Sequence, residues 1–160
     1  MFVVALLVIG LLTQVEVGTA SCTDPFIQLG EGCYYFIEGI ETWSSARAIC
    51  QILGDDVDLA VFDTLPDDYT HIASHILSKG LNFLWVGGTD QNHEDYWTWV
   101  DGTPMRLEAS YWDPASPRST SYDCARLDLV TEVIVRVRII NIICNVRNSF
   151  VCQQGVTPAI

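Results

Sequence analysis

The sequence predicts one α+β domain behind a short apolar leader. Two segments in the first half of the chain have the apolar spacing of helices, whereas residues from 83 onward alternate between short strand-like runs and polar loops. The length of 160 residues suits one domain, and a hydrophobic fraction of 49% is enough to form a buried core. All six cysteines follow the leader, which indicates a disulfide-linked domain formed outside the cytosol.

The leader, residues 1–20, is predicted to be a signal peptide. The apolar run from Phe2 to Leu12 is shorter than the roughly 20 residues that a membrane-spanning helix needs. Small residues at 18–20 suit cleavage before Ser21, so we expect a secreted, extracellular domain of residues 21–160. A short membrane anchor is the alternative for the leader, and no membrane span is expected after its cleavage.

Two strands and two helices are expected in the first half of the domain. Strands are predicted at 34–38 and 58–63. Thr42 is expected to cap a helix over 43–53, and a second helix is expected to begin at 66–68 and to end at Gly80. The predicted buried positions of the two helices are Trp43, Ala46, Cys50 and Leu53, and then Tyr69, Ile72, Ala73, Ile76 and Leu77. His71 and His75 fall opposite the second stripe and are expected to be exposed.

Strands and a long loop are expected in the second half. Strands are predicted at 83–87, 96–100, 133–139 and 149–153, with a loop at 107–121. In the third of these strands, Val135, Val137 and Ile139 alternate with Arg136 and Arg138, as in a half-buried strand. Two questions stay open. The tryptophans Trp97, Trp99 and Trp112 suit either the core or stacking on sugar rings, and the run 139–143 suits a buried strand, an interaction surface or an exposed edge.

Charge and motif content exclude several function classes. Eight basic and 20 acidic residues give a net charge of -12, which argues against a nucleic-acid partner because phosphate binding needs clustered Lys and Arg. There is no Cys-x-x-Cys pair for a zinc ribbon or a redox site. The Gly-x-Ser-x-Gly nucleophile motif is also missing, so the sequence gives no positive reason to expect an enzyme.

Several motifs in order resemble the C-type lectin-like family. These are the six-cysteine spacing from Cys22 to Cys152, the segment Trp85-Val86-Gly87-Gly88, the segment 97–104 (WTWVDGTP) and the pair Tyr111-Trp112. Gly88 stands where the family usually has leucine. The pattern is also similar to that of secreted arthropod lectin-like proteins.

The resemblance implies a fold and a disulfide pairing. It implies two helices, two small antiparallel sheets, a long loop region that carries the ligand site, and chain ends that lie close together. It also implies the disulfides Cys22–Cys33, Cys50–Cys152 and Cys124–Cys144.

Transfer of the family's sugar-binding calcium motifs leaves few oxygen ligands. The motif positions fall on Ser116, Pro117, Arg118, Tyr122 and Asn141, of which only Asn141 keeps a suitable oxygen. Arg118 would place a positive charge where the cation should lie, and Ca²⁺ needs six to eight oxygen ligands. We therefore expect no calcium-bridged sugar contact. No cofactor is certain from the sequence.

A second, auxiliary calcium site is less degraded. The resemblance implies that Asp90, Glu94 and Asp123 would hold it, and three converging carboxylates would repel one another without a cation. The alternative is that these are three solvated loop acids.

The function expected from this combination is recognition without catalysis. One hypothesis is calcium-independent binding of carbohydrate or microbial-surface glycoconjugates, with innate immunity as a setting. The other is a protein-binding lectin-like module, such as an inhibitor, a toxin-like protein or a matrix component, that binds no sugar. The expected partner is accordingly a glycan, a glycoconjugate or a protein ligand.

Overall fold

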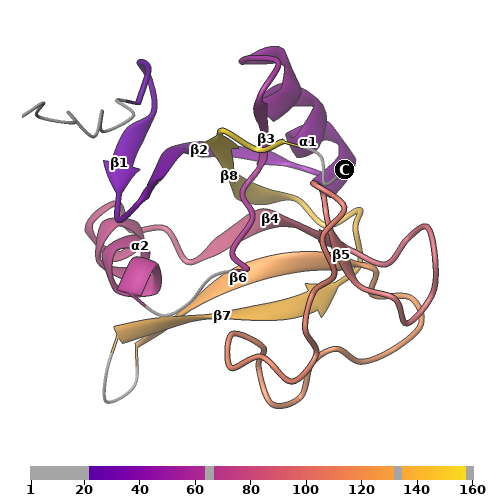
Figure 1. Cartoon of the computed structure of the whole chain (residues 1–160). Coiled ribbons are helices and arrows are strands. Elements are labelled where there is room, and N and C mark those ends of the chain that lie inside the picture. Colours follow the sequence, from indigo (N-terminus) through magenta and orange to yellow (C-terminus); the bar gives the residue numbers. More distant parts are fainter. Residues whose placement is uncertain (1–21, 64–66, 132–134, 158–160) are drawn as a thin grey trace, which may run out of the picture.

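The computed structural model describes residues 22–63, 67–131 and 135–157, so the predicted leader lies outside the described residues. The described residues form two helices and eight strands (Figure 1). In chain order they are β1 (Ile27–Leu29), β2 (Gly32–Glu41), α1 (Trp43–Ile52), β3 (Val57–Leu59), α2 (Asp67–Ser78), β4 (Phe83–Thr89), β5 (Thr98–Trp99), β6 (Cys124–Thr131), β7 (Val135–Ile142) and β8 (Asn148–Gln154). Among these residues, neither helix has the length and apolar character to cross a membrane.

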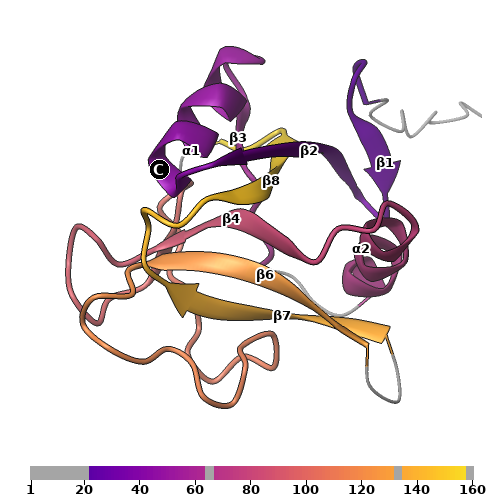
Figure 2. The same ribbon diagram turned by 180° about the vertical axis from the view of Figure 1, so that it is seen from behind.

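The strands join into one mixed sheet of order β1-β2-β8-β4-β6-β7, with β3 paired to β8 and β5 to β4. The expected α+β class with two helices is confirmed. The expected division into two small antiparallel sheets is replaced by a continuous path, because β8 pairs with β2 on one side and in parallel with β4 on the other. Figure 2 shows the same order from behind, with α1 and α2 on opposite sides of the sheet.

Helix α1 forms as its sequence predicts. The Oγ1 of the capping residue Thr42 accepts a hydrogen bond from Ser45 N at 3.4 Å, which satisfies a free N–H of the first turn. Trp43, Ala46 and Cys50 are buried. Leu53 was wrongly placed on the buried face. It is the C-cap and 40% exposed, because the helix ends one residue earlier.

Helix α2 follows the predicted stripe in part. Ile72, Ala73 and Ile76 are buried, but Leu77 is 48% exposed. Leu77 is turned about 100° from Ile76 around the helix axis and lies at the margin of the stripe. The expectation of an exposed His75 is also wrong. Its ring packs at 4.6 Å between centroids on Phe36, and burial, with a smaller effect of Lys79, lowers its pKa.

The strands differ from prediction mainly in length. The predicted strand at 58–63 is confined to β3, and the one at 96–100 shrinks to β5. Strand β6 was not predicted, although its alternation of apolar residues with Arg126 and Asp128 is the signal that could have revealed it. These two side chains pair at 2.6 and 2.8 Å, which neutralises both charges on one face of the strand. Residues 133–134 of the predicted strand at 133–139 lie outside the described residues.

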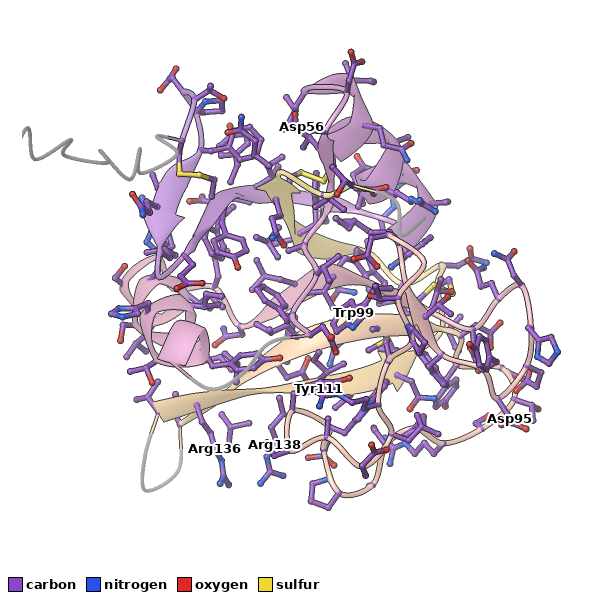
Figure 3. The ribbon with its side chains drawn as sticks, viewed as in Figure 1. Asp56, Asp95, Trp99, Tyr111, Arg136 and Arg138 are labelled. Atoms are coloured by element: carbon purple, nitrogen blue, oxygen red, sulfur yellow. A yellow bond between two sulfur atoms is a disulfide. The ribbon has the colours of Figure 1, made fainter. Side chains whose placement is uncertain are left out.

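The buried core contains the three tryptophans for which the sequence suited either a core position or stacking on sugar rings. Trp97, Trp99 and Trp112 are all at most 6% exposed, so they fill the core and do not offer ring faces to solvent. Figure 3 places Trp99 and Tyr111 in the interior, where their rings meet edge to face at 6.0 Å. Met105 packs in the same cluster. A Cβ at Gly88 would lie 2.5 Å from the Met105 sulfur, so Met105 occupies space that a leucine at 88 would need.

The three implied disulfides are all present. Cys22–Cys33 ties the start of the domain to β2, Cys50–Cys152 ties α1 to β8, and Cys124–Cys144 ties β6 to the segment after β7. The ends of the described chain meet, since Thr23 N donates to Gln154 Oε1 at 3.1 Å. The long loop region between β5 and β6 extends from the side of the sheet away from β1 and α2 (Figures 1 and 2).

Candidate functional site

A small cavity lies where the loop after β4 meets the long loop before β6. Its volume is about 140 Å³. The lining residues are Asp90, Glu94, Asp95, Trp97, Pro117, Arg118, Ser119, Thr120 and Asn141. The cavity therefore unites two groups of residues that the sequence placed in separate motifs, the acids after β4 and the degenerate positions around Arg118. Figure 3 shows Asp95 on the outer loop at this side of the domain.

Asn141 is committed to the loop backbone. It is only 3% exposed, on the inner face of β7. Its Oδ1 accepts from Arg118 N at 2.9 Å, and its Nδ2 donates to Arg118 O at 2.6 Å and to Tyr122 O at 2.9 Å. The side chain that kept a suitable oxygen thus serves to fasten the loop to the sheet.

The run 139–143 continues β7 and is not a separate surface. Ile139 and Asn141 are buried, Ile140 and Ile142 are half-buried, and Ile143 is 45% exposed. The buried-strand alternative therefore holds for one face of the run. Its last residue, Ile143, is the most accessible to a partner.

The remaining degenerate positions belong to the same fastened loop. Ser116 N donates to Asp113 O at 2.8 Å, and the Ser116–Pro117 peptide is cis. The Ala115 backbone N–H and the Arg138 guanidinium hold the pKa of Asp113 below its ordinary value, with a smaller contribution from the charge of Arg118. Figure 3 shows Arg136 and Arg138 pointing the same way from β7, and Arg138 reaches Asp113 at 2.9 Å.

Asp90 is the most unusual group in the cavity. It is 6% exposed, and its Oδ2 accepts from Asp95 N at 3.2 Å, while its Oδ1 has no hydrogen-bond partner among the described residues. The pKa of Asp90 is raised to about 6, chiefly by burial and to a smaller extent by the negative charges of Glu94 and Asp123, against the lowering effect of the Asp95 backbone N–H. Asp90 is therefore a buried acid with one oxygen that has no hydrogen-bond partner among the described residues, and the charges of two other acids act on it.

Asp123 is joined to Asp90 by a backbone hydrogen bond, but it does not line the cavity. Its carbonyl accepts from Asp90 N at 3.2 Å and from Thr89 Oγ1 at 2.6 Å. Its Oδ1 is buried and likewise lacks a hydrogen-bond partner among the described residues. In the part of the chain that the structure describes, no three His, Cys, Asp or Glu side chains converge as metal ligands. The auxiliary calcium site formed by Asp90, Glu94 and Asp123 stays a prediction.

Sequence reasoning missed three residues that line the cavity. Asp95 follows Glu94 directly, and a left-handed backbone (φ 64°) points its N–H toward Asp90. Ser119 and Thr120 add hydroxyl groups from the long loop. The sequence signal for these three residues was the run of polar residues around them. Only the fold shows that the two loops line one cavity.

A larger cavity of about 350 Å³ lies between the end of α1 and the segment after β5. Its buried acid, Asp58, is fully engaged. Arg47 donates to both of its carboxylate oxygens at 3.0–3.1 Å, and Gln51 Nε2 donates at 3.1 Å. This network holds α1 against β3 and leaves no unpaired charge on Asp58.

Comparison with known proteins agrees with the fold. The sequence profile of the Lectin C-type domain matches residues 40–154. The chain belongs to the C-type lectin domain family.

Individual relatives are distant. The chain is 26% identical over 104 residues to the C-type lectin domain family 4 member C of Homo sapiens, covering 65% of this chain and 46% of that protein. It spans between about a quarter and a half of the length of the curated relatives it matches.

Among the solved structures that share this fold are a glycan-bound lectin domain and an antifreeze protein. One is the C-type lectin domain of murine dendritic cell inhibitory receptor 2 in complex with N-glycan, with a TM-score of 0.65, 19% identity, and coverage of 84% of this chain and 99% of that one. The other is a calcium-independent type II antifreeze protein, with a TM-score of 0.65, 20% identity, and coverage of 84% and 95%.

Proposed function

We propose that this chain is a secreted, extracellular recognition domain that binds carbohydrate or microbial-surface glycoconjugates without a calcium-bridged contact. The observation that carries the proposal is that the Asn141 side chain is used in hydrogen bonds within the protein and is not free to bind a calcium ion. Its amide is hydrogen-bonded to the backbone of Arg118 and Tyr122, and Arg118 adds a positive charge beside it. A sugar ligand would then be held by direct hydrogen bonds in the cavity.

Support for a glycan ligand comes from the family. A domain of this fold has been solved with an N-glycan bound, and the fold also occurs in a protein described as calcium-independent. The proposed activity is binding and not catalysis, in agreement with a family of lectins. Three disulfides suit an oxidising extracellular setting.

A protein-binding module is the second candidate function. The segment between β7 and β8 favours it, because Ile143 is 45% and Val146 is 36% exposed there. Two accessible apolar side chains on one short segment suit contact with a protein surface better than contact with a sugar.

The test is a glycan array probed with the oxidised protein, with calcium and with excess chelator. Binding to a defined set of glycans that survives chelation is the expected result. Binding lost on chelation would contradict the calcium-independent part. No glycan binding, together with a saturable protein partner that is lost in an Ile143→Ser/Val146→Ser variant, would favour the second candidate.

A further inference from the structure

The larger cavity, between the end of α1 and the segment after β5, has the size of a small-molecule site. Its volume is about 350 Å³, and sites for small ligands usually span roughly 300–1,000 Å³. The cavity beside Asp90, at about 140 Å³, lies below that range. Of these two cavities, the larger one is therefore the better candidate for enclosing a whole sugar ring.

Arg47 lines the larger cavity, and its guanidinium is held in one orientation. Nε and Nη2 donate to the Asp58 carboxylate at 3.0–3.1 Å, and Nη2 also donates to Val100 O at 3.4 Å. The guanidinium lies over the Trp43 ring, 5.8 Å from its centroid. Nη1 makes no hydrogen bond among the described residues, and it is open to solvent. Arg47 therefore keeps one donor free whose position is fixed in advance.

Two acceptor side chains line the same cavity and are fixed in a similar way. Gln51 lies one helical turn after Arg47, and its Nε2 donates to Asp58 at 3.1 Å. A carboxylate only accepts, so the amide turns its nitrogen to Asp58 and leaves Oε1 free. Asp101 Oδ1 accepts from Thr103 N at 2.9 Å and from Thr103 Oγ1 at 2.7 Å, while Oδ2 is open to solvent. Each side chain thus uses one polar atom to fix its orientation and keeps another for a ligand.

The charges of the lining favour an uncharged ligand. Arg47 pairs with Asp58, so the exposed Asp55 and the half-buried Asp101 supply the charge that remains. These two carboxylates repel an anionic group, and a cationic group would lie in the same cavity as the Arg47 guanidinium. A pair of neutral hydroxyl groups avoids both costs, because each hydroxyl can accept from Arg47 and donate to Gln51 or Asp101.

We propose that the larger cavity binds one neutral hexose unit of a glycan through two adjacent free hydroxyl groups. This inference rests on the proposed glycan-binding function and adds a second site to it, apart from the cavity beside Asp90. Val57, Val100 and Val156 supply an apolar wall for the C–H groups of the sugar ring. The polar contacts come from side chains that the protein has already oriented, so this binding is independent of calcium.

The test is a chemical-shift titration of the oxidised protein, in excess chelator, with the neutral disaccharides lactose, mannobiose and cellobiose. At least one of them should cause saturable shifts at residues 47, 51 and 101–103. Glycerol and n-butylamine are the controls, and an affinity for either equal to that of the sugar would overturn the assignment to a hexose.

The positions of the shifts separate this inference from the proposed function. Saturable shifts confined to residues 90–95 and 117–120 would place the sugar in the cavity beside Asp90. They would overturn this inference and leave the proposed function intact. The absence of a saturable shift at residues 47, 51 and 101–103 with all three sugars would overturn it as well. Failure of the proposed function appears separately, as the absence of any bound glycan on the array.

Matched variants test the named side chains. Gln51→Met removes the amide at an exposed position and should weaken sugar binding about fivefold, the effect of one neutral hydrogen bond. Asp101→Asn keeps the oxygen that accepts from Thr103, removes the charge and should weaken binding about tenfold. Gln28→Met, at an exposed position on β1 that lines neither cavity, should leave binding unchanged. Melting temperatures check that each variant is folded. Unchanged affinity in both Gln51→Met and Asp101→Asn would overturn the proposal.

Discussion

The Asn141 side chain joins β7 to the long loop through both polar atoms of the Arg118 backbone. Oδ1 accepts from Arg118 N at 2.9 Å and Nδ2 donates to Arg118 O at 2.6 Å. The side-chain amide therefore makes the same pair of hydrogen bonds with the Arg118 backbone that a residue of a neighbouring β-strand would make. A third bond to Tyr122 O, at 2.9 Å, closes the loop from the other end. One buried side chain therefore holds the wall of the cavity that faces Asp90.

Asn141→Ala should release this loop. The change removes three hydrogen bonds and leaves backbone groups of Arg118 and Tyr122 without their partner, so unfolding should become easier by about 2–4 kcal/mol. Chemical denaturation measures the loss, and limited proteolysis should cut the loop near Arg118 faster. Asn145→Ala is the control, because Asn145 is exposed and should change stability little. An equal effect of the two variants would contradict the role given to Asn141.

Gly87→Ala should destabilise the sheet at the contact between β4 and β3. A Cβ at this position would lie 2.9 Å from Leu59 O and 2.7 Å from the Val100 side chain, and the backbone atom cannot move aside cheaply. A loss of about 1–3 kcal/mol is expected from such overpacking, measured by thermal and chemical denaturation. Gly39→Ala, whose Cβ would meet only Ile37 at 3.8 Å, should be close to neutral.

The disulfides Cys50–Cys152 and Cys22–Cys33 should differ in their contribution to stability. Cys50–Cys152 spans a sequence separation of 102 residues and Cys22–Cys33 a separation of 11. In the chain-entropy account, loops of these lengths correspond to about 5 and about 3 kcal/mol. Paired replacement of Cys50 and Cys152 by alanine should therefore lower the denaturation midpoint more than replacement of Cys22 and Cys33. The reverse order would show that local packing outweighs loop length.

Stability should fall as the pH rises through the pKa of Asp90. Burial raises this pKa from 3.8 to about 6, so between these values the folded protein binds a proton that the unfolded chain has lost. The unfolding free energy then decreases as the pH rises from about 4 to above 6, by up to about 3 kcal/mol from this group. Asp90→Asn should remove that component. Denaturation curves of the two proteins at several pH values measure the difference, and parallel pH profiles would contradict the prediction.

Several features of the fold followed directly from local sequence. The cap at Thr42, the buried face of α1 and most of the α2 stripe depend on neighbouring residues and helical geometry, so a single sequence suffices to predict them. Leu77 and His75 were misjudged because each lies at the margin of its helix face. There, the neighbour across the interface decides burial, as Phe36 does for His75.

The sequence by itself determined that this is a disulfide-linked α+β domain resembling a C-type lectin, with most calcium-ligating positions replaced. These properties depend on spacing and on the chemistry of individual residues, which the chain carries locally. Only the tertiary structure decided that Asp90 and the Arg118 loop share one cavity, that Asn141 is committed to backbone hydrogen bonds, and that all three open tryptophans are core. The burial of a side chain and the partners of its polar atoms depend on segments distant in the chain. The folding of β4, β7 and the long loop against one another sets both.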